Sequence, residues 1–540
     1  MRKLRLGTGA LVGLLATAPA VTLMVLADRL AGLPFVPFDL FDWTTRVLPG
    51  GLVTFGIDSM IGALEFVGLD VADTAKTAER ATAVLAFVVL GAVAGALFFA
   101  FFALRRSRPD AASGLVMGAL LGLPLAAISL AIGGARERPL VSVLWLAVVF
   151  LGWGVLVAWG FRRTVPAAAA GTRAAGAASV ERLDRRRFLV RLGAASAVVT
   201  VAGAGLARVL ARSEGGGELA ASGAHRTETG KGSPFPNAGD PVMPAPGTRP
   251  EYTPLKDHYK VFIRTEPEEV DGERWRLEVT GRVDRPLRLT LGELRSRYPV
   301  HDQYVTLSCI SGRVGTGLIG TTLWSGARLQ DVLADAGLRD GARFLHVRSA
   351  DGYYETVDLE LVRADPRILL CYDWDGHPLP SDHGFPLRIW LPDRYGMKQP
   401  KWIESIEVSS EYVPGYWVER NWDREARMKA TSVIDTVAVA AAQDLGGRRL
   451  IPVGGIAHAG ARGISRVEVR VDGGPWQKAK LRAPLSETTW VIWRHDWPFE
   501  KGDHTFEVRC AEADGTPQIE ERRPQRPSGA TGLHRLEMET

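Results

Sequence analysis

The chain has 540 residues, a formal net charge of +5 and a mean hydropathy of +0.02. This length permits three or more domains, and the hydropathy averages an apolar half, 1–211, with a half of ordinary soluble composition, 212–540. The net charge is small for this length, and the arginines gather at the edges of apolar segments. Both observations argue against a nucleic-acid partner. Three cysteines with no close pair argue against a disulfide framework or a zinc site.

The apolar half is predicted to form a five-span membrane anchor. A span needs about 20 apolar residues, and such stretches occur near 6–27, 81–104, 114–134, 140–161 and 188–210. Basic clusters precede the first stretch, follow the second and lie between the fourth and the fifth, so five spans put all three clusters on one side. Positive clusters mark the cytoplasm, which places the N-terminus inside and the soluble half outside. A weaker apolar segment, 47–69, carries Asp58 and Glu65 and is interpreted as interfacial or re-entrant.

The fifth stretch begins with a pattern that is typical of protein export. Asp184-Arg-Arg-Arg-Phe-Leu189 precedes Ala/Gly-rich sequence, so 184–210 resembles a twin-arginine signal placed inside the chain. An ordinary positive-inside cluster would need neither the phenylalanine nor the leucine. Residues 1–224 contain no histidine and no cysteine. We therefore expect no haem in this chain, and a membrane half that serves as an anchor or contacts a partner.

Three further regions follow along the chain. Residues 212–250 are rich in Gly, Ala, Ser and Pro and are predicted to be a flexible linker. Strands and short helices mix from 251 to 430, which predicts an α+β domain. From 431 to 540 nearly every segment is typical of a strand, and Asp472-Gly-Gly marks a hairpin. This last region is predicted to be a β-sandwich of immunoglobulin-like size.

Cys309 is the first candidate site residue. It ends the β-type run Tyr304-Val-Thr-Leu-Ser and opens a glycine-rich loop, after which a helix is expected to begin at Thr322. A thiol beside closely approaching backbone suits a large cofactor with one soft protein ligand. The alternative is a buried, inert cysteine, the commonest fate of a free thiol. Cys371 and Cys510 lie in apolar strand patterns and fit that alternative better.

Two further motifs follow Cys309. They are Asp375-Gly-His-Pro-Leu-Pro-Ser-Asp-His-Gly-Phe-Pro-Leu-Arg388 and Arg394-Tyr-Gly-Met-Lys-Gln-Pro-Lys401. Together with the Cys309 segment, in this order, they resemble the sulfite oxidase family of molybdopterin oxidoreductases. The resemblance runs from about Tyr252 to the C-terminus. In that family the domain after the cofactor domain often mediates dimers, so the resemblance implies a homodimer through 431–540.

The resemblance also implies a cofactor and its ligands. In the family a lone cysteine thiolate binds molybdenum and the pterin dithiolene supplies the other sulfurs, so Cys309 becomes the expected metal ligand of a molybdenum–molybdopterin cofactor. A metal ion deprotonates such a thiol outright. The positions that hold the pterin or its phosphate correspond to His383, Arg388, Lys398 and Lys401.

Catalytic residues carry over by position as well. Arg264 matches an arginine that lines the anion pocket, a task that suits the guanidinium fork. Tyr353 or Tyr354 lies where the family has a pocket tyrosine, and Arg420 is expected to reach the pocket or the cofactor. Val314, however, stands where sulfite oxidases keep a second pocket arginine, which weakens the case for a small dianion.

We therefore expect a molybdopterin-dependent oxidoreductase that acts on sulfite or a related small oxo-acceptor. Its electrons would pass to a separate carrier, because the sequence contains no Cys-x-x-Cys-His attachment site. A reductase of sulfoxide-type oxo-donors on the same cofactor is the first alternative. A membrane-anchored binding protein that has lost its metal is the second, and an intact Cys309 counts against it.

Overall fold

The structure is a computed structural model that describes residues 2–49, 51–53, 55–56, 59, 71–132, 139–165, 186–206, 235–445 and 447–540. The chain divides into two compact units, 1–49 with 76–220 and 50–75 with 221–540, and each is described by itself. Most of the segment 47–69, the start of the predicted export signal and residues 212–234 of the predicted linker lie outside the described residues.

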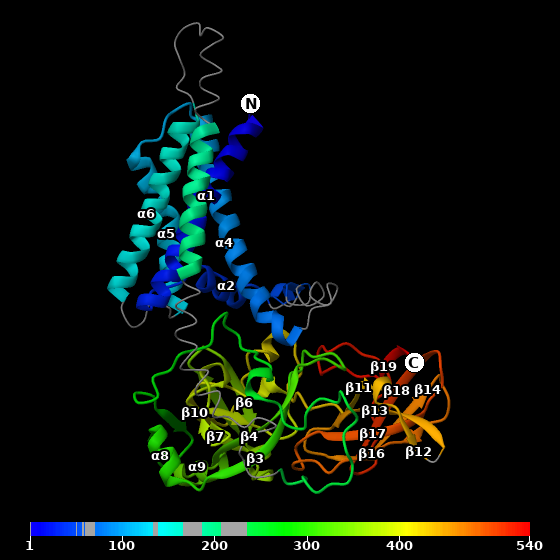
Figure 1. The fold of residues 1–540 in the computed structure, drawn as a ribbon. Helices are drawn as coiled ribbons and strands as arrows, with labels where there is room; N and C mark the ends of the chain where they lie inside the picture. Colours follow the sequence, from blue (N-terminus) through cyan, green and yellow to red (C-terminus); the bar gives the residue numbers. More distant parts are fainter. Residues whose placement is uncertain are drawn as a thin grey trace. The chain divides into compact units, whose positions relative to one another are not determined.

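The first unit consists of helices (Figure 1). They are α1 (Arg2–Ala31), α2 (Val36–Val47), α4 (Val71–Leu104), α5 (Ala111–Ile132), α6 (Pro139–Thr164) and a further helix at Arg186–Leu206. Five of these contain stretches long and apolar enough to cross a membrane, Leu6–Ala31, Lys76–Leu104, Ala111–Ile132, Pro139–Thr164 and Arg186–Leu206. The prediction of five apolar helices is therefore confirmed, and membrane association follows from their length and composition. The orientation of the bundle stays a prediction.

Small residues bring these helices together. A Cβ atom added to Gly13 of α1 would collide with the carbonyl oxygen of Gly91 in α4, and one added to Gly118 of α5 would collide with that of Phe150 in α6. Such close backbone contact is typical of helix pairs in a bilayer, where van der Waals packing replaces the hydrophobic effect.

The second unit begins with an α+β region that holds two sheets. One sheet has the order β2-β1-β10-β5-β6, and the other runs β3-β4-β7-β8 with β9 beside β7. The strands are β1 (Leu277–Gly281), β2 (Leu287–Leu289), β3 (His301–Ser308), β4 (Ile319–Arg328), β5 (Phe344–Ser349), β6 (Tyr354–Asp358), β7 (Leu369–Trp374), β8 (His377–Pro378), β9 (Arg388–Trp390) and β10 (Ile403–Ser409). The helices are α8 (Leu291–Arg297), α9 (Leu329–Ala336) and α10 (Leu359–Ala364), with short 3-10 turns η1 (Leu255–Asp257), η2 (Ser381–His383), η3 (Gly396–Lys398) and η4 (Val418–Arg420).

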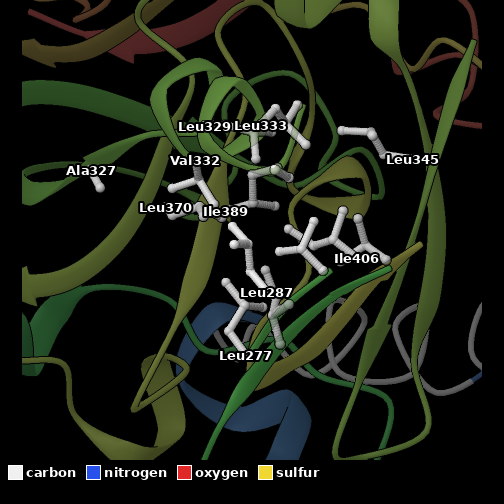
Figure 2. Packing of buried hydrophobic residues seen from close by; sticks show 14 of the residues in the cluster. Leu277, Leu287, Ala327, Leu329, Val332, Leu333, Leu345, Leu370, Ile389 and Ile406 are labelled. Atoms are coloured by element: carbon white, nitrogen blue, oxygen red, sulfur yellow. The ribbon is translucent and has the colours of Figure 1, made fainter. Parts of the chain in front are cut away.

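One apolar core joins these elements. Figure 2 shows Leu329, Val332 and Leu333 of α9 packed with Leu370 of β7 and Ile389 of β9. Helix α9 begins seven residues later than the sequence predicted, because 322–328 belongs to β4, which pairs with both β3 and β7. Strand pairing on both sides satisfies the backbone of this segment and overrides its local helical pattern.

The C-terminal region forms two further sheets, with orders β11-β13-β17-β16 and β15-β14-β18-β19, and with β12 on β13. The strands are β11 (Thr431–Val437), β12 (Gln443–Leu445), β13 (Arg448–His458), β14 (Ile464–Val471), β15 (Gln477–Lys478), β16 (Lys480–Leu481), β17 (Val491–Pro498), β18 (Asp503–Glu512) and β19 (His534–Glu539); a 3-10 turn, η5 (Val439–Ala441), lies before β12. Both sheets contribute to one core, with Ile451 and Trp493 from the first and Val469 and Phe506 from the second. The hairpin predicted at Asp472 forms between β14 and β15. An immunoglobulin-like relationship stays a prediction.

Candidate functional site

Cys309 follows directly after β3 and opens the loop that joins β3 to β4. Ser308 pairs with Ile319 across the hairpin, and the Cys309 N–H donates to the Leu318 carbonyl at 2.9 Å. These bonds fix the backbone where the thiol leaves the sheet. The Sγ atom lies 3.0 Å from the Ser311 hydroxyl, and burial raises the pKa of the thiol. The free protein therefore keeps a thiol here, which a bound metal would deprotonate.

Four buried polar side chains form a second group, which we call the polar cradle and define as His258, Tyr259, His383 and Arg388. The rings of His258 and His383 lie 5.4 Å apart, and those of His258 and Tyr259 lie 5.1 Å apart. The Arg388 guanidinium donates to the His383 carbonyl at 3.0 Å. Tyr259 belongs to a buried cluster against which Cys309 packs, which places the cradle beside the candidate metal ligand.

The cradle contains polar atoms that have no hydrogen-bond partner among the described residues. They are His258 Nε2, the Tyr259 hydroxyl, His383 Nε2 and Arg388 Nε. Burial lowers the pKa of His258 to about 3 and that of His383 well below its usual range, so both rings are neutral at physiological pH. Buried polar groups are normally hydrogen-bonded. A ligand with many donors and acceptors, such as a pterin, would satisfy them, so the cradle fits the cofactor that the sequence predicts.

The two predicted cofactor lysines have different surroundings. Lys401 lies at the edge of the cradle, where its ammonium donates to the Asp382 carbonyl at 2.9 Å and its side chain packs against Gly384. Lys398 is buried, and its ammonium donates to Glu355 Oε1 at 2.6 Å and to the Thr356 carbonyl at 3.0 Å. The structure thus brings His383, Arg388 and Lys401 together, and directs the charge of Lys398 toward a carboxylate.

The predicted catalytic tyrosines belong to a separate aromatic group. Tyr353 is buried and donates to the Met397 carbonyl, whereas Tyr354 donates to Glu419. Both rings contact Tyr416, at 5.6 and 5.8 Å between centroids. Arg420 packs its guanidinium 3.6 Å from the centre of the Tyr416 ring and donates to the Tyr416 carbonyl at 2.8 Å. Arg420 therefore lies with this group.

Arg264 is partly buried and pairs with Glu268. Its charge, like that of Lys401, acts on the pKa of Asp351. Burial raises that pKa to about 6. Arg264 and Lys401 thus act on the same carboxyl group.

A cavity of about 50 Å³ opens beside Cys309. Part of the lining comes from the loop between β3 and β4, and the rest comes from Arg249, from Tyr395, from the segment 428–433 and from residues further along the C-terminal region. The lining residues are Arg249, Ser308, Cys309, Gly312, Arg313, Val314, Gly315, Thr316, Leu318, Ile319, Tyr395, Met428, Lys429, Thr431, Val433, Ile456, His458 and Ala530. This volume admits a few water molecules or a small substrate group.

Val314 faces the C-terminal region and packs against the apolar cluster of Val433, Ile456, Trp490 and Ile492. Position 314, where the resemblance described above implies a second pocket arginine, is thus part of an apolar contact in this chain. His534 of β19 also supports the loop, because a Cβ atom on Gly315 would lie 2.6 Å from its Nε2. The C-terminal strands therefore help to set the conformation of the loop that carries Cys309.

Sequence reasoning missed His258, Tyr259 and Lys429. The first two lie in a loop without periodicity, after η1, and nothing local marks them. The fold closes this loop onto β4, where a Cβ atom on Gly320 would lie 2.6 Å from the His258 ring. Lys429 adjoins the predicted domain boundary at 430/431, which made it resemble a surface lysine.

Comparison with known proteins places this site in a known family of domains. Residues 264–417 match the model of the oxidoreductase molybdopterin binding domain. The match begins at Arg264 and ends before Arg420, and it includes Cys309, His383 and Arg388.

Three relatives illustrate the range of matches. The mitochondrial sulfite oxidase of Rattus norvegicus is 32% identical over 269 residues, which cover 42% of this chain and 49% of that protein. The uncharacterized oxidoreductase YuiH of Bacillus subtilis (strain 168) is 31% identical over 151 residues, 28% of this chain and 73% of that protein. The putative protein-methionine-sulfoxide reductase subunit YedZ1 of Azospira oryzae is 33% identical over 159 residues, 29% of this chain and 58% of that protein. The chain spans about half the length of the rat relative.

Proposed function

The chain belongs to the sulfite oxidase family of molybdopterin-dependent oxidoreductases, and on that premise we propose that it oxidises sulfite or a related small oxyanion outside the cytoplasm. Membership of this family counts against a metal-free binding protein. The observation that carries the substrate proposal is the charge of the cavity beside Cys309. Among the described residues its lining includes Arg249, Arg313 and Lys429 but no carboxylate, which favours an anion over a neutral substrate.

The reaction is a two-electron oxidation. Sulfite and water give sulfate, two protons and two electrons. When bound, the cofactor supplies this oxo transfer and holds the two electrons until a separate carrier takes them. Cys309 would anchor the metal, and the cradle of His258, Tyr259, His383 and Arg388 would orient the pterin through its unpartnered polar atoms.

The remaining predicted residues support this assignment from further away. Lys401 would contact the pterin or its phosphate from the edge of the cradle, since a lysine ammonium suits phosphate. The ion pair of Lys398 with Glu355 would hold η3 in place. Tyr353 and Arg420 would act through their shared contact with Tyr416, and Arg264 through its charge near Asp351.

The reductase of sulfoxide-type donors is the second candidate. It is supported by the apolar part of the same cavity, with Val314, Met428, Val433 and Ile456, and by the similarity to the Azospira oryzae protein. In this case the chemistry runs in reverse, and the sulfoxide takes up two electrons and two protons to give the sulfide and water.

The membrane half would anchor the enzyme, with the N-terminus in the cytoplasm and residues 212–540 outside. The basic clusters at the ends of the helices support this orientation. The lipid bilayer is then a partner, and the electron carrier would meet the enzyme outside. A homodimer through 431–540 stays a prediction that size determination in detergent would test.

Substrate assays of the purified, molybdenum-loaded full chain test the proposal. Sulfite oxidation is followed with ferricyanide as the electron acceptor, and sulfoxide reduction with a reduced viologen as the donor. We expect sulfite turnover that Cys309→Ser abolishes and that Cys510→Ala, which removes a thiol buried in the C-terminal core, preserves. Turnover of a sulfoxide without any turnover of sulfite would replace the proposal with the reductase.

A further inference from the structure

The cavity beside Cys309 is positively charged, and its cations differ in how far they are already neutralised. Arg249 binds Asp435 through two nitrogens, with Nε to Oδ1 at 2.9 Å and Nη2 to Oδ1 at 2.6 Å. Its guanidinium also packs over the Trp490 ring at 5.9 Å. This bidentate pair neutralises most of the charge of Arg249 and occupies much of its hydrogen-bonding capacity.

Lys429 differs from Arg249. Its ammonium makes no hydrogen bond and no ion pair with any residue in the described part of the chain, whereas Arg313 has an interaction partner. The charge of Lys429 acts on the pKa of Asp423. The Asp423 carboxylate, however, already accepts hydrogen bonds from the Ser528 hydroxyl at 2.6 Å and from the Ala426 N–H at 2.7 Å. Lys429 is thus a cation of the cavity wall that no contacting carboxylate neutralises.

The backbone of Lys429 is nevertheless held firmly. Its N–H donates to the Tyr395 hydroxyl at 3.2 Å, and Tyr395 lines the same cavity. The neighbouring residues Met428 and Ala430 are buried, and Arg462 donates to the Met428 carbonyl at 2.7 Å. A fixed backbone that carries a partly exposed lysine with an uncommitted ammonium suits a binding group, because only the side chain remains to be ordered when a ligand arrives.

A solvated surface lysine is the simpler explanation, and most lysines are of this kind. Lys501, between β17 and β18, is an example, because it is exposed and lies outside the lining of the cavity. Lys429 differs from it in two respects, since it is only partly exposed and lines the cavity that contains the Cys309 thiol.

We propose that Lys429 is the substrate-binding cation of this site and selects small, doubly charged oxyanions. Val314, on the loop that carries Cys309, is committed to an apolar contact and supplies no charge to the cavity. The substrate charge would then be bound by Lys429, just before the C-terminal region, and not by the loop that carries Cys309. This inference rests on the proposed function, since it assigns a substrate class to the same cavity.

The test compares Lys429→Met with Lys429→Arg and with Lys501→Met as the matched control, all in the molybdenum-loaded full chain. Removing the cation should raise the KM for sulfite about tenfold or more while kcat changes little, because the charge contact forms in the bound ground state as well as in the transition state. Lys429→Arg should restore much of the affinity, and Lys501→Met should behave as the wild type. The KM for dimethyl sulfoxide, which is neutral, should not rise in any variant.

Direct anion binding provides a readout that does not depend on turnover. Sulfate, the product of sulfite oxidation, should raise the Tm of the wild type and of Lys501→Met in a concentration-dependent manner. It should raise the Tm of Lys429→Met much less at the same concentration.

The outcomes separate the inference from the proposed function. If the wild type oxidises sulfite and Lys429→Met has an unchanged KM and an unchanged sulfate shift, the assignment of Lys429 is overturned while the proposed function stands. If the wild type reduces the sulfoxide but neither turns over sulfite nor gains Tm from sulfate, the proposed function fails and the inference fails with it. A loss of kcat at constant KM would instead indicate a structural role and would also overturn the inference.

Discussion

The buried ion pair between Glu355 and Lys398 allows the stability of the cofactor domain to be tested quantitatively. The Glu355 side chain is fully buried and that of Lys398 is 7% exposed, and one oxygen of the carboxylate has no hydrogen-bond partner among the described residues. Glu355→Gln removes the negative charge and leaves the buried ammonium with neutral acceptors only, the new amide oxygen and the Thr356 carbonyl. Removing one partner of such a pair costs about 3–5 kcal/mol, since the remaining charge stays buried.

Lys398→Met leaves the opposite charge and therefore has a different pH dependence. Burial raises the pKa of Glu355, so the folded variant takes up a proton at a pH at which the unfolded chain does not. Folded-state proton uptake makes stability rise as the pH falls. The cost of Lys398→Met should accordingly shrink toward acidic pH, whereas that of Glu355→Gln should not. The double variant should cost less than the sum of the two.

The assay is thermal unfolding of the full chain in detergent, followed through the transition of the soluble unit. A loss of 3–5 kcal/mol corresponds to a fall in Tm of roughly 6–20 °C for a domain of this size. Glu537→Gln, which breaks the exposed pair with Arg535, is the matched control and should change Tm little. If the Tm of Glu355→Gln equals that of the Glu537→Gln control, the account of a buried, mutually dependent pair is refuted.

Three further predictions follow from single sites. The pKa of Asp351, raised to about 6 with Lys401 and Arg264 opposing the rise, should make wild-type stability fall as pH increases from about 4 to 6, and Asp351→Asn should flatten this Tm profile. Val314→Arg should lower Tm instead of improving sulfite turnover, because it inserts a charge into an apolar contact; an unchanged Tm with faster turnover would contradict this. Arg185→Lys combined with Arg186→Lys should block export of a reporter fused after Thr540 while the first four spans insert, since lysine keeps the charge. Normal export of this double variant would mean that the arginines are only a positive-inside cluster.

The sequence predicts the apolar helices well, because these depend on local patterns. Continuous apolar runs indicate bilayer-spanning helices whatever their partners are, and Cys309 stands out through its glycine-rich loop. The start of α9 shows the limit. Residues 322–328 form a strand because β3 and β7 pair with it, and such nonlocal pairing is not encoded in local propensity.

The remainder of the site depends on contacts between segments that are distant in the sequence. His258 reaches the cradle only because its loop folds against Gly320, and Lys429 joins the cavity because the C-terminal strands pack on the Cys309 loop. Residues 235–250, predicted to belong to a linker, likewise pack through Arg249 on Asp435. These placements follow from tertiary structure, which a single sequence does not display.

The central claim is that Cys309 binds molybdenum, and the metal content and sulfur coordination of the purified full chain test it most directly. Elemental analysis with X-ray absorption at the molybdenum edge should find about one molybdenum per chain in the wild type, and one sulfur ligand fewer in Cys309→Ser, because serine offers a hard oxygen in place of a soft thiolate. Cys510→Ala should match the wild type in both measurements. A wild type that purifies without molybdenum after expression with an active cofactor supply, or a Cys309→Ser variant with the same number of sulfur ligands, would contradict the account.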